Sequence, residues 1–293
     1  MYLLKNIHAT FSRRLLGAST VALLALAAGT AQAQPMVPPG ELDRLVSRVA
    51  LYPDPLLAQV LSAASYSDQI PDAAKWADQH HYLSGDALAG AIAGDHLPWD
   101  PSVQALLPFP SVLDTMASDM GWTTQLGNAV LAQRQDVMDA VQRMRQKARD
   151  FGYLRTNPQV IVSGGPYITI LPARPDFYVV PYYDPAVVFI APRPGFAVGA
   201  AINFGFGISI GAAFRPWGWG AVRIGWDTHG WFIGDRPWGR TWVNRTTYAH
   251  PYALPHYETG RRVESHELIE RSVKEREAVR TGHAPPPEEH HKK

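Results

Sequence analysis

The sequence predicts an α+β fold, with an N-terminal compact multi-helix domain followed by a small antiparallel β unit. Two changes of pattern along the chain support this. Over residues 41–152, apolar residues recur every three or four positions, which is the period of an amphipathic helix. Over residues 157–190, short runs rich in Val, Ile and Tyr lie between Gly and Pro, which is typical of strands joined by turns.

The helical domain is expected to hold about seven short helices. Asp54-Pro55 and Asp100-Pro101 each place an aspartate at an N-cap position and a proline at the first helical position. The last helix is expected over about 134–151, with basic residues in its final turns and Gly152 as its C-terminal cap. Both aspartates are therefore interpreted as helix caps.

The β unit begins after Asn157-Pro158. Residues 159–163 and 166–171 flank Gly164-Gly165, a pattern that favours a hairpin. Two further strands are expected at 177–180 and 186–190. We expect this β unit to pack on the helices.

A Gly/Trp-rich hydrophobic region follows at 195–242. Residues 196–214 carry no charge and allow two interpretations: a helix with small residues every four positions, as in membrane helices, or a strand that alternates large and small residues. Exposed indoles can stack on sugar rings or lie at a lipid headgroup boundary, whereas a packed hairpin would bury them. The candidate binding residues of this region are Trp217, Trp219, Trp226, Trp231, Trp238 and Trp242.

Residues 1–33 are predicted to be a signal peptide, with 34–40 as a linker. A basic start precedes an apolar run at 15–28, and Ala31-Gln32-Ala33 places small residues where a signal peptidase reads. An uncleaved anchor helix is the alternative, but the run is shorter than the roughly 20 residues that span a bilayer. We expect an exported, periplasmic or envelope-associated protein. At the other end, 257–293 is expected to form a charged helix and a disordered tail.

Composition excludes several classes of function. The chain has 27 Lys and Arg against 26 Asp and Glu. Three of the basic residues lie in the leader, so the remainder is close to neutral and lacks the excess positive charge of a nucleic-acid binder. The chain has no cysteine, which excludes disulfides, thiol nucleophiles and cysteine-ligated metals.

Several segments resemble one known family. They are Val49-Ala-Leu-Tyr-Pro-Asp-Pro-Leu-Leu-Ala-Gln-Val-Leu61, Trp99-Asp-Pro-Ser-Val-Gln-Ala-Leu-Leu107, Met120-Gly-Trp-Thr-Thr-Gln-Leu-Gly127, Asp136-Val-Met-Asp-Ala-Val-Gln-Arg143 and Val179-Val-Pro-Tyr-Tyr-Asp-Pro185. In this order they resemble a bacterial family of exported proteins, domain of unknown function 3300, over roughly 42–190. The resemblance implies an envelope location and no known activity, so it assigns no catalytic residue.

No catalytic or metal-ligating residue is assigned from the sequence, and no cofactor is expected. Gly207-Ile-Ser-Ile-Gly211 matches a hydrolase nucleophile pattern around Ser209, but Pro216 and glycine-rich sequence follow where that pattern needs a helix. The spacing of His229, His250, His256 and His266 follows no zinc pattern.

The leading hypothesis is a non-enzymatic scaffold or binding protein. Its Gly/Trp-rich region would contact the membrane surface, peptidoglycan or an envelope protein. The alternative is a hydrolase of an envelope polymer with Asp54 and Asp100 in one cleft. A third hypothesis is self-association through the glycine alternation. The sequence leaves the oligomeric state open.

Overall fold

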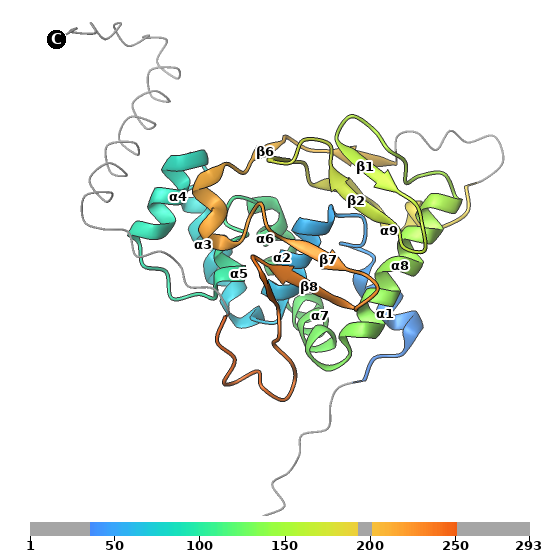
Figure 1. Ribbon diagram of the computed structural model, residues 1–293, viewed down its shortest axis with the longest axis horizontal. Coiled ribbons are helices and arrows are strands. Elements are labelled where there is room, and N and C mark those ends of the chain that lie inside the picture. Colours follow the sequence, from blue (N-terminus) through green and yellow to red (C-terminus); the bar gives the residue numbers. More distant parts are fainter. Residues whose placement is uncertain (1–35, 193–200, 251–293) are drawn as a thin grey trace, which may run out of the picture. The chain divides into compact units, whose positions relative to one another are not determined.

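The computed structural model describes residues 36–192 and 201–250 (Figure 1). These described residues fall in one compact unit. The expected signal peptide, charged helix and tail all lie outside the described residues, as do His256 and His266.

Helices dominate the first part of this unit and small antiparallel sheets follow, so the predicted α+β class is confirmed. The helices before the sheets are α1 (Pro39–Val46), α2 (Asp54–Ala64), the 3-10 helix η1 (Ser67–Gln69), α3 (Ile70–Gln79), α4 (Gly85–Gly94), α5 (Pro101–Gln104), α6 (Pro110–Ser118), α7 (Met120–Ala132) and α8 (Arg134–Asp150). Every residue of α2 is buried, because α5, α7, β2 and β7 pack around it. Apolar residues cover all sides of α2, so this helix forms the centre of the core.

The helix ends confirm some of the expected caps and correct another. Gly152 has a φ of 79°, the left-handed conformation that favours glycine after a helix, and it follows α8 as predicted. Asp100 caps α5 by accepting a hydrogen bond from Ser102 N at 2.9 Å. Asp54 makes no cap bond, so that prediction was wrong. Its carboxylate contacts Arg145 instead.

The strands form several small antiparallel sheets. Their bounds are β1 (Val160–Ser163), β2 (Thr169–Pro172), β3 (Phe177–Tyr178), β4 (Pro181–Tyr183), β5 (Ile202–Phe204), β6 (Ile208–Ser209), β7 (Arg223–Gly225), β8 (Gly230–Ile233) and β9 (Arg236–Pro237). The β1–β2 hairpin is as predicted, with Ser163 opposite Thr169 and a turn longer than Gly-Gly alone. β3 pairs with β6, β4 with β5, and β7, β8 and β9 form one sheet. Thus the glycine-rich segment completes sheets begun by the β unit.

The strand expected at 186–190 is absent from the described chain, because Pro185–Val188 forms the short helix α9. Asp184 caps this helix by accepting from Ala186 N at 2.8 Å, and Pro185 is its first residue. The Asp-Pro pair starts a helix here, whereas apolar β-branched residues had favoured a strand.

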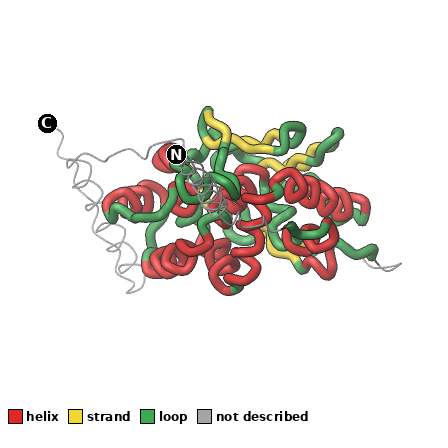
Figure 2. Tube along the Cα trace, turned by 90° about the horizontal axis from the view of Figure 1, so that it is seen from below, coloured by secondary structure: helices red, strands yellow, loops and turns green. Residues whose placement is uncertain are grey.

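The helical interpretation of 196–214 is wrong for its described part, residues 201–214. That part holds β5, β6 and the start of the 3-10 helix η2 (Ala212–Trp217). Figure 2 shows most strands gathered on one side of the helices. The orange β7 and β8 of Figure 1 lie close to α2: β7 contacts α2 directly, and Trp231 of β8 donates a hydrogen bond to Ser62 of α2.

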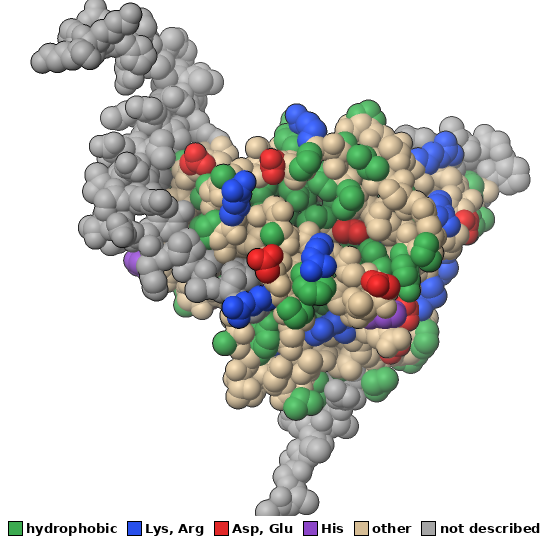
Figure 3. All heavy atoms as spheres, viewed as in Figure 1, with side chains coloured by type: hydrophobic (Ala, Val, Ile, Leu, Met, Phe, Trp, Pro, Cys, Tyr) green, Lys and Arg blue, Asp and Glu red, His purple; other side chains and the backbone are tan. Residues whose placement is uncertain are grey.

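The surface in Figure 3 shows Lys and Arg interspersed with Asp and Glu, with hydrophobic side chains between them. Within residues 36–192 and 201–250, no helix has both the length and the apolar character needed to cross a membrane.

Candidate functional site

The tryptophans of the Gly/Trp-rich region are core residues. Trp217, Trp219, Trp226, Trp231 and Trp238 are each 5% exposed or less, and Trp242 is half-buried. The expectation of a surface of exposed indoles is therefore wrong. Glycine leaves the indoles little to pack against within their own segment, and the helical core supplies the missing contacts.

Hydrogen bonds attach four of these indoles to the helical part, namely those of Trp217, Trp219, Trp226 and Trp231. Trp219 Nε1 donates to the Ala105 carbonyl at 3.0 Å, and Trp231 Nε1 donates to Ser62 Oγ at 2.8 Å. Trp217 Nε1 donates to Gln104 Oε1 at 3.0 Å, and Gln59 Nε2 donates to the Trp217 carbonyl at 3.0 Å. Buried indole N–H groups need such acceptors. The tryptophans therefore close the core instead of presenting a binding surface.

A buried ion pair lies at the centre of this packing. The Arg145 side chain is fully buried, and its Nη1 lies 2.5 Å from Asp54 Oδ1. Arg145 also donates to the carbonyls of Ala50, Tyr52 and Ile168. Each charge is thus neutralised and hydrogen-bonded, as burial requires.

Arg145 was not among the residues singled out from the sequence, although its position carried a signal. Val141 and Met138 precede Arg145 by four and seven residues, so all three share one face of α8, and all three are buried. A charge on the apolar stripe of an amphipathic helix indicates a buried partner.

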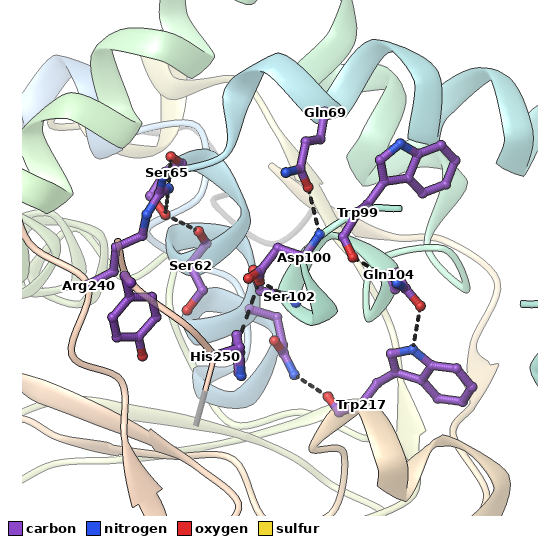
Figure 4. Close-up of polar contacts among 12 residues, drawn as sticks. Ser62, Ser65, Gln69, Trp99, Asp100, Ser102, Gln104, Trp217, Arg240 and His250 are labelled. Carbon is purple, nitrogen blue, oxygen red and sulfur yellow. Dashed lines mark hydrogen bonds and ion pairs between the residues drawn. The ribbon is translucent and has the colours of Figure 1, made fainter. Parts of the chain in front are cut away.

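A second polar cluster surrounds Asp100 (Figure 4). Asp100 Oδ1 accepts from Ser102 N and Oγ, and lies 3.8 Å from His250 Nε2. Burial lowers the pKa of His250, and the Asp100 carboxylate opposes that shift. Burial raises the pKa of the Tyr66 phenol, and Asp100 raises it further.

Arg240 joins this cluster to α2. Its guanidinium lies over the Tyr66 ring at 3.6 Å and donates to the Ser65 carbonyl. The cluster ties the end of the described chain to α2 and α5. Asp100 and His250 are almost fully buried, and neither lines the two pockets described below.

The other residues considered for chemistry lie apart. Ser209 is exposed in β6, opposite Phe177, and is not on a strand-to-helix turn. His229 Nε2 lies 3.0 Å from Asp139 Oδ1 on α8. Within the described part of the chain, no group of three or more His, Cys, Asp or Glu side chains could hold a metal ion.

A pocket of about 280 Å³ opens beside the β unit. Leu51, Tyr153, Leu154, Val160, Pro181, Ile202 and Phe204 form its apolar lining, and Arg155, Thr156 and Asn157 add polar groups. Leu51, Leu154 and Val160 are buried members of a second small core, on which Ile202 and Phe204 pack. Its size is just below the roughly 300–1,000 Å³ of small-molecule pockets, so it has room for a few side chains and not for a large cofactor.

A shallower groove of about 670 Å³ lies between α1, α8 and α9. It includes Glu41, Asp43, Arg44 and Lys147. Asp43 is paired with Arg143 at 2.8 Å and with Lys147 at 3.4 Å, and Arg44 pairs with Glu41 at 3.8 Å. These charges satisfy one another, which leaves the 280 Å³ pocket as the better candidate site.

A family model described as "Protein of unknown function (DUF3300)" matches residues 38–230. The chain belongs to this family. The resemblance seen in the sequence is thereby confirmed. Every residue that lines the 280 Å³ pocket lies within the DUF3300 match, whereas Arg240 and His250 lie beyond it.

One similar protein is the "Uncharacterized protein YacH" of Escherichia coli (strain K12), which is 33% identical over 218 residues. The match covers 59% of this chain and 35% of YacH, so the chain spans about a third of that relative's length. No solved structure matches the chain.

Proposed function

We propose that this DUF3300 protein is an exported, non-enzymatic binding protein of the cell envelope, which uses the 280 Å³ pocket to contact its partner. Export is supported by the basic, apolar and Ala-x-Ala pattern of residues 1–33. The helical core, with its indoles inserted from the Gly/Trp-rich region, is the scaffold that holds the pocket.

The observation that carries the binding role is the composition of the pocket. An apolar lining bordered by a few polar groups is the usual character of a ligand site. The lining comes from three parts of the chain: Leu51 before α2, the 152–160 segment after α8, and the β4–β5 sheet.

In this proposal the Gly/Trp-rich region contacts the partner through its strand β5. It contributes Ile202 and Phe204 to the pocket, and the Phe206 side chain just beyond them is 99% exposed. Its contact with a partner would therefore run through β5 and not through the indoles.

The alternative hydrolase function needs carboxylates that converge on a substrate. Asp54 is buried against Arg145 and accepts from Trp226 Nε1 at 3.0 Å. Asp100 caps α5 and contacts His250. The described carboxylates that motivated the hydrolase hypothesis therefore have structural partners and do not favour it.

The test is fractionation of a Gram-negative bacterium that expresses the full chain. We expect a mature form that begins near Gln34, absent from the cytoplasm and partly retained with the envelope. Ile202→Glu places a charge in the pocket and should release the protein. Val243→Glu changes a side chain that is 84% exposed and outside the pocket, so retention should persist.

Equal retention of the two variants would contradict binding through the pocket. A full-length product in the cytoplasm would contradict export. Circular dichroism of both variants controls for loss of fold.

A further inference from the structure

The backbone of β5 has one edge open within the described chain. Gly205 N donates to the Val180 carbonyl at 3.3 Å, so these residues form a hydrogen-bonded pair of the β4–β5 ladder. Such pairs alternate along antiparallel strands. The backbone N–H and C=O groups of Ile202 and Phe204 therefore point away from β4. Pro181 is opposite Phe204 and has no N–H to donate, which fits this register.

Strands β1 and β5 flank the pocket, and their outer edges differ. The outer edge of β1 is covered, since Thr156 Oγ1 accepts from Val162 N and donates to the Val162 carbonyl. Asn157 Oδ1 accepts from Val160 N at 3.0 Å. In the described residues β5 pairs with β4 and with no other strand. An open strand edge is a template for another chain.

The open edge and the pocket are on the same part of β5. Ile202 and Phe204 are two positions apart, so their side chains share one face, and both line the pocket. In an antiparallel pair, residues directly opposite each other share a face. A strand added beside β5 would place alternate side chains over the pocket.

The charge at the pocket favours one kind of peptide. Arg155 is exposed among the lining residues, and none of those residues is acidic. A carboxylate next to the apolar side chains of a bound peptide would face this guanidinium.

We propose that the ligand is an extended peptide segment that adds antiparallel to β5, inserts two alternating apolar side chains into the pocket and places a carboxylate near Arg155. This inference rests on the proposed function and names the chemistry of its partner. The pairing is strand addition, in which main-chain hydrogen bonds give affinity and the pocket gives specificity.

The test uses the full chain purified from the periplasmic fraction and a fluorescein-labelled hexapeptide of alternating Val and Thr that ends in Glu. Binding is followed by fluorescence polarisation. N-methylation of either Val amide should weaken binding by about tenfold, because that N–H would pair with Ile202 or Phe204. N-methylation of the intervening Thr should have little effect, because its N–H points outward.

Variants of the protein test the contributions of the apolar pocket and of Arg155 to peptide binding. Ile202→Glu should abolish binding, and Arg155→Gln should reduce the preference for a terminal Glu over a terminal Lys. Arg223→Gln, an exposed arginine on β7, is the matched control.

Equal effects of all N-methyl positions would overturn strand addition. If the folded protein bound no peptide of alternating apolar and polar residues, the proposal of an extended peptide as the ligand would be wrong. If Ile202→Glu still released the protein from the envelope in that case, the pocket would remain the binding site for a non-peptide ligand. The proposed function would then survive the failure of this inference.

Discussion

Trp226 and Asp54 are joined across 172 positions of the chain by a hydrogen bond from the indole Nε1 to Oδ2 of 3.0 Å. The Arg145 guanidinium lies 4.8 Å from the centre of the Trp226 ring and binds the other oxygen of the same carboxylate. One buried aspartate thus links α2 and α8 to the Gly/Trp-rich region.

Loss of Arg145 should lower the free energy of unfolding far more than loss of the partly exposed Arg143. Arg145→Met leaves the Asp54 charge buried without its partner, so we expect the free energy of unfolding to fall by about 3–5 kcal/mol. Arg143→Met removes a partly exposed pair with Asp43, worth about 1 kcal/mol or less. Urea denaturation of both variants measures the difference, and similar losses would contradict the central role of Arg145.

Removal of residues 195–242 should destroy the fold. A region that served only to bind a partner could be deleted without loss of the helical fold. This deletion would instead remove the buried tryptophans that cover α2 and α5. We expect a product that aggregates or binds a hydrophobic dye. A monodisperse, cooperatively unfolding product would show that the helices form an independent domain.

Helices α2 and α7 pack closely at Gly127. A Cβ atom at Gly127 would overlap the Ala64 backbone carbonyl, which cannot move aside without distorting α2. Gly127→Ala should therefore destabilise the protein by about 1–3 kcal/mol despite the higher helix propensity of alanine. The control on the same helix is Gly121→Ala, whose Cβ would lie 3.5 Å from Asp119. A shift in thermal midpoint for Gly127→Ala alone supports the close packing, and equal shifts would contradict it.

His250 should make stability depend on pH. Four groups face it or its partner: Asp100 of α5, Tyr66 after α2, and Tyr248 and Arg240 of the final segment. Burial lowers the pKa of His250, so below about pH 6.5 the unfolded chain binds the proton more readily than the folded one. The folded state should lose stability as pH falls through this range.

Thermal unfolding between pH 8 and pH 5 checks this effect. His250→Gln cannot be protonated there, so we expect it to lose less stability on acidification than the wild type. A loss as large as that of the wild type would show that His250 does not contribute.

The sequence indicates the helical part well because local signals decide it. The stripe of α8, the Gly152 cap and the Asp100 cap all depend on residues close together in the chain. The strand assigned to 186–190 failed because Asp184-Pro185 outweighed β propensity, although the same motif had been used correctly at Asp100.

The candidate site was harder to predict because distant segments build it. Leu51, Leu154 and Ile202 come together only in the folded chain. The indoles were misassigned for a related reason: their acceptors, such as Ser62 and the Ala105 carbonyl, lie more than 100 positions away. Alternation of large and small residues made a strand one of the two interpretations of residues 196–214, and the open edge of β5 follows from its register with β4.

The most direct test of the account is site-specific photo-crosslinking in intact bacteria. A photoreactive phenylalanine analogue would replace Phe204 in the pocket and, in a second strain, Val243 beside Trp242. Binding through the β5 pocket predicts a discrete adduct from position 204 and none from position 243. An adduct from position 243 alone would show that the partner contacts the protein near Trp242. That result would contradict the proposal that the pocket is the binding site.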